Sequence, residues 1–303
     1  MRLPFYASLW LLTSCSLVSP SADSGIRVLG VAQDGGRPQL GCTKTCCTDS
    51  QEPKRVVALQ VAHAGHWVLV DATPDMAAQI RETGSLPSAI VLTHAHVGHY
   101  TGLIHLGREV MSADHMPVWC SARMASFLRG NGPWSQLVEL GNIELHVFKD
   151  EVAFTPIPGI IFRPYSVPHR EEFSDTFGFS IEVNGFKTLF IPDIDAWQPW
   201  GQLERLASVH DVAILDATFF DDSELPGRDM SVIPHPRVPS TMALLRPLVH
   251  RKALQVIFIH LNHTNPLWVK DSEEAILVRS QGFEIAQRGM WITGASLRGQ
   301  KQP

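Results

Sequence analysis

Charged side chains are scarce in this sequence, and neither sign is in strong excess. They make up 18% of the 303 residues, and 25 Lys and Arg against 30 Asp and Glu give a net charge of −5. A domain that binds nucleic acid needs a basic patch or stripe that neutralises phosphates. We therefore expect a small-molecule substrate and no nucleic-acid partner.

Long apolar runs are absent after the first residues, so the sequence predicts no transmembrane helix, which needs about 18 or more apolar residues in a row. The beginning of the chain differs. Met1 and Arg2 precede a mostly apolar stretch at residues 3–12, and small residues follow it. This order is typical of an export signal. We expect residues 1–22 to be an export signal and tether, and the protein to be exported.

The expected export signal contains a candidate lipid-attachment site. The stretch Leu-Thr-Ser-Cys that ends at Cys15 resembles the lipobox of bacterial lipoproteins, whose cysteine is lipidated and becomes the mature N-terminus. The alternatives are a plain signal peptide that is cleaved further along the chain, or a misassigned start codon. We expect a periplasmic protein, or a lipoprotein anchored to the membrane through Cys15.

Cysteine is also scarce, with five in the chain, but three of them are clustered: Cys42, Cys46 and Cys47. Neighbouring cysteines rarely bond to each other because the geometry is strained. Two interpretations stay open. One is a structural zinc ion held by the three thiolates and a fourth ligand such as a histidine. The other is a disulfide from Cys42 to Cys46 or Cys47. We favour the zinc ion, and we expect Cys120 to be an ordinary buried cysteine.

Histidine, by contrast, is abundant, and three of the 14 histidines lie close together: His94, His96 and His99. They directly follow the apolar residues 88–92, which read as a buried strand. The histidines then lie on a loop at a strand tip, where a rigid scaffold can direct side chains to one point. Imidazole suits zinc, iron, copper or nickel. The run therefore predicts a metal site.

Three further candidate ligands also follow apolar, strand-like segments: His169, Asp193 and His260. Asp195 competes with Asp193, and His263 competes with His260. We prefer Asp193, and we prefer His260 because it lies at the exit of its predicted strand. Together with His94 and His96, His169 would complete a three-histidine set that leaves a fourth position open for water.

Alternating and periodic patterns predict strands and helices in both halves of the chain. Strands are predicted at residues 26–32, 55–61, 67–72, 88–92, 117–120, 143–148, 160–167, 178–183, 188–191, 212–215 and 256–259. Helices are predicted at residues 74–82, 122–129, 203–207, 239–250 and 272–281, and a further helix beginning within 102–111. This order fits two sheets with helices outside.

The run from His94 to His99 resembles the His-x-His-x-Asp-His signature of the metallo-β-lactamase superfamily, with Gly98 in place of the Asp. The resemblance implies an α/β fold, a four-layer αββα sandwich, formed by one domain at residues 23–303. It also implies two metal positions. The first would be held by His94, His96 and His169, and the second by His99, Asp193 and His260. Without a carboxylate at Gly98, the second position would be weaker, empty or selective for another metal.

Five short motifs resemble one branch of this superfamily, that of pyrroloquinoline quinone biosynthesis protein B. They are Gly35-Gly36-Arg37-Pro38-Gln39 before the cysteines, Gly98-His99-Tyr100-Thr101-Gly102-Leu103, Asp216-Ala217-Thr218-Phe219, Pro234-His235-Pro236, and His260 followed by Thr264-Asn265-Pro266. Two features depart from that branch, whose members act in the cytosol. This chain carries an expected export signal, and it is richer in metal-type histidines.

Asp216 and His235 are the candidate catalytic pair. Asp216 ends a predicted strand, and His235 lies between two prolines. A carboxylate that holds an imidazole in one tautomer near a metal is suited to protonating a leaving group. Some phosphodiester-cleaving members of the superfamily resemble this arrangement. The alternative is that Asp216 caps a loop and His235 is merely exposed.

Three functions remain open from the sequence. The leading one is an exported hydrolase of an ester, lactone, amide or phosphodiester with one or two zinc ions, because zinc lowers the pKa of bound water to about 7 and so supplies hydroxide. The second is a non-haem iron oxygenase or hydroxylase related to pyrroloquinoline quinone biosynthesis, because two histidines and a carboxylate favour iron. The third is a non-catalytic lipoprotein that binds a quinone-like or metal-containing ligand.

Overall fold

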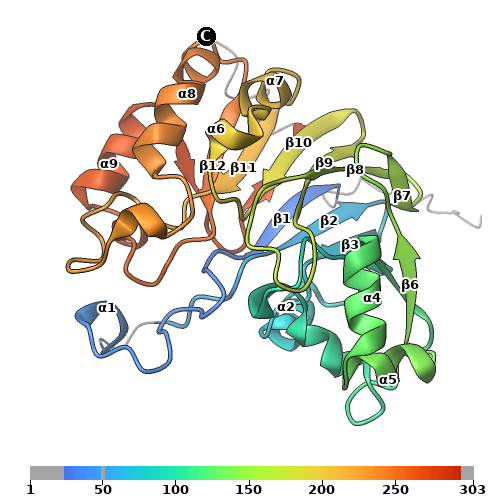
Figure 1. Ribbon diagram of the computed structural model, residues 1–303. Coiled ribbons are helices and arrows are strands. Elements are labelled where there is room, and N and C mark those ends of the chain that lie inside the picture. Colours follow the sequence, from blue (N-terminus) through green and yellow to red (C-terminus); the bar gives the residue numbers. More distant parts are fainter. Residues whose placement is uncertain (1–23, 49–51, 295–303) are drawn as a thin grey trace, which may run out of the picture.

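The computed structural model describes residues 24–48 and 52–294. Two seven-stranded sheets pack against each other, and helices cover the outer face of each (Figure 1). The predicted four-layer αββα sandwich is therefore confirmed. The expected export signal and Cys15 lie outside the described residues, and none of the described helices is long and apolar enough to cross a membrane.

The first sheet has the strand order β14-β1-β2-β3-β4-β5-β6. Its strands are β1 (Gly25–Gly30), β2 (Ala58–His63), β3 (His66–Val70), β4 (Ala89–Val91), β5 (Met116–Cys120), β6 (Ile143–Val147) and β14 (Trp291–Ile292). β2 and β3 form a hairpin whose turn residues Ala64 and Gly65 both have positive φ, 50° and 81°. Such a turn matches the twist of the strands that it joins, and β3 to β6 then run parallel.

The second sheet has the order β13-β12-β11-β10-β9-β8-β7. Its strands are β7 (Phe154–Ile157), β8 (Ile160–Ser166), β9 (Phe177–Val183), β10 (Phe186–Ile191), β11 (Val212–Asp216), β12 (Gln255–Ile259) and β13 (Glu284–Ile285). β7 to β10 are antiparallel, and β10 to β13 are parallel. Each sheet thus has an antiparallel part followed by a parallel part.

Helices connect the parallel strands, as parallel pairs require. On the first sheet they are α2 (Met76–Thr83), α3 (Val97–Tyr100), η1 (Thr101–Leu106), α4 (Ala122–Gly130) and α5 (Trp134–Glu139). On the second they are α6 (Trp197–Trp200), α7 (Leu203–Ala207), η2 (Met230–Val232), α8 (Val238–His250), η3 (Pro266–Trp268) and α9 (Glu273–Ser280). The short α1 (Thr45–Thr48) carries two of the clustered cysteines and stands apart from both helical layers (Figure 1).

Two hydrophobic cores follow from the alternation of side chains along the strands. In β3, Val68 and Val70 belong to the larger core, which joins both sheets and reaches α7, α8 and α9. Trp67 and Leu69 belong to the smaller core under α2, α4 and α5. The shared core holds the two sheets together, so the loops at their ends keep fixed positions relative to each other.

The predicted helix within residues 102–111 is wrong. The segment forms only the 3-10 helix η1, which ends at Leu106. Gly102 packs so closely on the loop after β3 that a Cβ there would meet the carbonyl of Thr73 and lie 2.8 Å from Met76 Cβ. Its N–H donates to Ala72 O at 2.8 Å. Docking on a neighbouring loop thus takes the place of regular helical hydrogen bonds.

Candidate metal centre

The predicted ligands lie on loops that leave the carboxyl ends of several strands. β10, β11 and β12 pair in parallel, with Ile191 opposite Leu215 and Leu215 opposite Phe258. Their carboxyl ends therefore meet at one edge of the second sheet. The loops after β10 and β12 carry Asp193 and His260. The loops after β4 and β8 bring His94, His96 and His169 to the same place.

The structure brings together the four side chains at the first metal position. One ligand atom from each of His94, His96, His169 and Asp193 lies within 4.8 Å of the others. His94 Nε2 is 3.4 Å from Asp193 Oδ2, and His169 Nε2 is 3.1 Å from Asp193 Oδ1. His96 Nδ1 is 3.2 Å from His169 Nε2. This spacing would let one ion touch all four side chains.

His99 and His260 approach the same oxygen of Asp193 as His94 does. Their Nε2 atoms are 3.8 and 3.7 Å from Asp193 Oδ2. Asp34 joins them, because its Oδ1 is 3.2 Å from His99 Nε2. Asp34 lies in the Gly-rich loop after β1 and is not among the ligands predicted from the sequence. The only signal there was that its neighbours Gly35 and Gly36 begin one of the motifs.

In each of the five histidines at this centre, one ring nitrogen lies within hydrogen-bonding distance of an oxygen, and the other nitrogen faces the cluster. The tied pairs are His99 Nδ1 with Asp71 Oδ2 at 2.7 Å, His169 Nδ1 with Asp195 Oδ1 at 2.8 Å, His260 Nδ1 with Thr218 Oγ1 at 2.8 Å, His94 Nδ1 with Thr93 Oγ1 at 2.9 Å and His96 Nε2 with Glu172 Oε2 at 3.1 Å. A proton held on the tied nitrogen leaves a lone pair on the other, which is the form that a metal binds.

Two threonines fix the tautomers of His94 and His260. Thr93 Oγ1 donates to Asp71, so it accepts from the His94 Nδ1–H. Thr218 Oγ1 donates to Asp216 at 2.7 Å and accepts from the His260 Nδ1–H in the same way. Both Nε2 atoms are left as acceptors within the cluster.

Several buried polar atoms at the cluster find no hydrogen-bond partner within the described part of the chain. They are His94 Nε2, His99 Nε2, His260 Nε2, Asp193 Oδ1 and Asp34 Oδ1. Burying an unpaired polar atom is costly, and native structures rarely leave several side by side. Cations at the two positions would satisfy all five atoms. The residues present therefore fit a metal centre.

The charges at the centre also suit cations. Burial would raise the pKa of Asp193, but the charges of His260, His169 and His235 hold it well below its usual value. Burial lowers the pKa of His94 well below its ordinary value. Asp193 and His94 are thus in the states in which these side chains bind metals, an ionised carboxylate and a neutral imidazole. Burial lowers the pKa of His99, but Asp71 and Asp34 raise it well above its ordinary value, so an ion at the second position would displace a proton from this ring.

Asp216 and His235 form the predicted pair beside this cluster. His235 Nδ1 is 2.8 Å from Asp216 Oδ2 and 3.3 Å from Asp193 Oδ1. His235 is buried rather than exposed, and it has a strained left-handed backbone with φ of 83°. Arg237 donates to the carbonyls of His235 and Met230 and so holds this loop in place. Burial lowers the pKa of His235, but the carboxylates of Asp216 and Asp193 raise it to about 9.

The clustered cysteines form a second candidate site with His263. The Sγ atoms of Cys46 and Cys47 are 3.8 Å apart, and His263 Nδ1 lies 3.6 and 3.3 Å from them. Cys42 completes the group, and all three thiols are free. Tetrahedral zinc with Zn–S bonds of about 2.3 Å places two sulfurs about 3.8 Å apart. His260 and His263 therefore serve different sites, and zinc binding by the cysteines stays a prediction.

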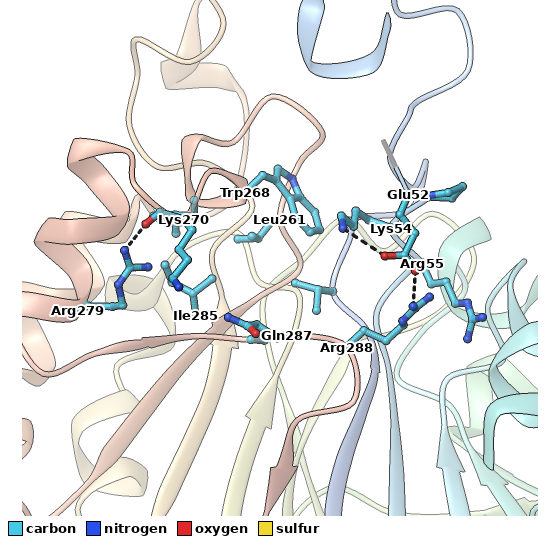
Figure 2. Close-up of a pocket in the computed structure, with 14 residues that line it drawn as sticks. Glu52, Lys54, Arg55, Leu261, Trp268, Lys270, Arg279, Ile285, Gln287 and Arg288 are labelled. Atoms are coloured by element: carbon cyan, nitrogen blue, oxygen red, sulfur yellow. Dashed lines mark hydrogen bonds and ion pairs between the residues drawn. The ribbon is translucent and has the colours of Figure 1, made fainter. Parts of the chain in front are cut away.

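Two hollows differ in their relation to the histidines. One, of about 570 Å³, is lined by His235, Asp195, Arg170 and the loop 230–234, so it gives access to the candidate catalytic pair. Figure 2 shows another, of about 300 Å³, that is rich in basic side chains and contains none of the predicted site residues. Glu52 pairs with Arg288 there. Of these two hollows, the one beside His235 borders the candidate catalytic pair.

Comparisons with known proteins agree with this fold. The family described as the Beta-lactamase superfamily domain matches residues 66–261. Coenzyme PQQ synthesis protein B of Rhizobium meliloti (strain 1021) is 26% identical, over 91% of this chain and 99% of that protein. The protein of the same name from Pseudomonas putida (strain GB-1) is 29% identical, over 88% and 99%.

Solved structures show the same fold. The Zn²⁺-bound PqqB from Methylobacterium extorquens superposes with a TM-score of 0.76 and 21% identity, over 88% of this chain and 99% of that one. A diphosphatase from the PhnP family superposes with a TM-score of 0.66 and 21% identity, over 89% and 96%. The short form of human tRNase Z has a TM-score of 0.56 and 15% identity, over 88% and 98%.

Proposed function

Because the chain belongs to the β-lactamase superfamily, we propose that it is a metal-dependent hydrolase that cleaves a phosphodiester, or a related ester, lactone or amide. The orientation of the histidines carries this proposal. Five imidazoles each have one nitrogen tied to an oxygen and the other turned towards Asp193. A merely polar loop region has no need of such an arrangement.

His94, His96 and His169 would hold a first ion, and His99 and His260 would contribute to a second, with Asp193 between them. When bound, such ions lower the pKa of water to about 7 and polarise the bond that is cleaved. Imidazole and carboxylate ligands suit zinc and iron alike. We favour zinc because a similar fold has been solved as the Zn²⁺-bound PqqB.

His235 would protonate the leaving group. Asp216 holds its Nδ1, so Nε2 is the nitrogen left to meet a substrate that enters from the adjacent hollow. With its pKa raised to about 9 by Asp216 and Asp193 against the effect of burial, His235 carries a proton at neutral pH. A charged imidazole in this position also favours an anionic substrate, and for this reason we place phosphodiesters first.

A second candidate function is oxidative. The similarity to Coenzyme PQQ synthesis protein B extends over 91% of the chain at 26% identity, which favours a role on a quinone precursor. His99, Asp193 and His260 would then form a two-histidine, one-carboxylate set of the kind that binds non-haem iron. Purified protein that contains iron and consumes oxygen would support this candidate over hydrolysis.

Two phosphodiesters with different leaving groups test the hydrolytic proposal. His235→Ala should lower kcat for an alkyl leaving group by about 100- to 10,000-fold, because an alkoxide needs a proton as it leaves. The loss should be much smaller for p-nitrophenolate, which leaves without one. His115→Ala is the control, because His115 is an exposed histidine on the loop before β5. Equal losses for both substrates would exclude His235 as the acid, and activity that survives His96→Ala would exclude the proposed centre.

A further inference from the structure

The second metal position lacks the carboxylate that the superfamily signature places at residue 98, where this chain has Gly98. We propose that Asp34, from a different segment of the chain, supplies that carboxylate and completes a two-metal centre. This inference rests on the proposed function and assigns a metal ligand that the signature does not contain.

The position of Asp34 supports this role. Its Oδ1 lies 3.2 Å from His99 Nε2, and a ligand atom from each of Asp34, His99 and His260 lies within 4.8 Å of the others. Asp34 Oδ1 is buried and has no hydrogen-bond partner among the described residues, as is also true of His99 Nε2 and His260 Nε2. Three unpaired polar atoms thus face one point, and a cation there would satisfy all of them.

Gly98 and Asp34 compete for the same space. A Cβ on Gly98 would lie 2.8 Å from both Cα and Cγ of Asp34 and closer still to its Oδ1. No side chain fits at residue 98 while Asp34 keeps this position. Gly98 therefore has two effects. It removes the carboxylate of the signature, and it leaves the space in which the carboxylate of Asp34 lies.

The loop after β1 is built to hold Asp34 beside His260. Gln33 N donates to Leu261 O at 2.9 Å, and Leu261 N donates to Val31 O at 2.9 Å. The residues that directly precede Asp34 are thereby fastened to the residue that directly follows His260. The two proposed ligands Asp34 and His260 thus lie on segments that backbone hydrogen bonds hold together.

The charge of Asp34 is suited to a cation. Its Oδ1 lies 3.2 Å from His99 Nε2, where an ion held by His99 and His260 would be. The second position then has two imidazoles, the Asp34 carboxylate and a share of Asp193. This set restores the number and type of ligands that a carboxylate at residue 98 would have given.

Asp34→Asn tests the assignment, because asparagine keeps the size of the side chain and removes its charge. The full chain would be equilibrated with buffered free Zn²⁺, and bound zinc would be measured by elemental analysis and competitive titration. We expect the variant to lose one zinc ion, or to bind that ion at least 10-fold more weakly, while its other ions stay bound. Asp114→Asn is the matched control, since Asp114 pairs with His115 on an exposed loop and should change nothing.

Gly98→Ala provides a second test that leaves every carboxylate in the chain. Its methyl group should push Asp34 away and cause the same loss of one ion. An unchanged zinc affinity in both variants would overturn the assignment. A different result would show that the metal centre itself is absent: the wild-type chain would bind no more zinc than His96→Ala. That result would overturn both the proposed function and the assignment of Asp34.

Discussion

Thr93 and Thr218 perform the same task in the two halves of the molecule. Each donates its hydroxyl proton to a buried aspartate and accepts a proton from the Nδ1 of a histidine. The aspartates Asp71 and Asp216 are themselves completely buried. At the scale of single residues, the centre therefore depends on side chains that never touch a metal but decide which ring nitrogen can bind one.

Thr218→Val should weaken the second metal position. The change keeps the shape of the side chain but leaves His260 Nδ1 and Asp216 Oδ1 without this partner in a buried place. Zinc affinity at that position should fall about 10- to 100-fold. The free energy of unfolding should fall by about 1–3 kcal/mol. Competitive zinc titration and urea unfolding measure the two effects.

Thr188→Val is the matched control for this prediction. Thr188, in β10, is fully buried like Thr218, but its Oγ1 has no hydrogen-bond partner within the described chain. Valine at this position should therefore leave the free energy of unfolding unchanged or raise it, and it should leave the zinc affinity unchanged. A similar loss of zinc affinity in both variants would mean that the hydroxyl of Thr218 does not orient His260.

At the scale of elements, the carboxyl ends of the strands supply most of the candidate site, and this part could be predicted from the sequence. His94, His96, Asp193 and His260 each follow an apolar run, and such a run ends where a buried strand ends. Asp34 could not be found in this way. Its place depends on how the loop after β1 docks on Leu261, a contact between segments far apart in the chain.

The limits of the fold prediction have similar causes. The expected helix within residues 102–111 is replaced by η1, because Gly102 packs against the loop after β3. β7 was missed because it is an edge strand interrupted by Pro156, and proline removes a hydrogen-bond donor from the ladder. In both cases tertiary contacts, rather than the local pattern, decide the conformation.

The cysteine cluster should stabilise the loops that carry Asp34 and His260. Cys46→Ser should remove one zinc ion and, with a loss of about 2 kcal/mol, lower Tm by roughly 4–8 °C. The structural reason is that His263 and the cysteines join the loop after β12 to the loop after β1. Cys120→Ser is the control for metal content, since Cys120 is buried in β5 away from the cluster. An unchanged zinc content in Cys46→Ser would contradict this role.

At the scale of the whole molecule, the site needs both sheets. The loop after β4 of the first sheet carries His94, and the loops after β10 and β12 of the second carry Asp193 and His260. The shared core fixes these loops relative to each other. A centre of this kind is rigid because two packed sheets, and not one flexible loop, set the distances between its ligands.

Localisation is a further property of the whole chain. We propose that the protein is exported and anchored through Cys15, because the start of the chain resembles a lipoprotein signal. Cys15→Ala should move the protein out of the membrane fraction of the cell, while the metal content of the folded domain stays the same. Immunoblots of separated fractions give the answer, and an unchanged distribution would argue against lipid attachment at Cys15.

Elemental analysis of the full chain, purified in detergent without added metal, tests the central claim most directly. We predict three zinc ions per wild-type chain, two at the histidine centre and one at the cysteine cluster, and fewer in His96→Ala. The opposite result is a folded wild-type chain whose metal content equals that of His96→Ala. That outcome would contradict the metal centre, and with it the hydrolytic function.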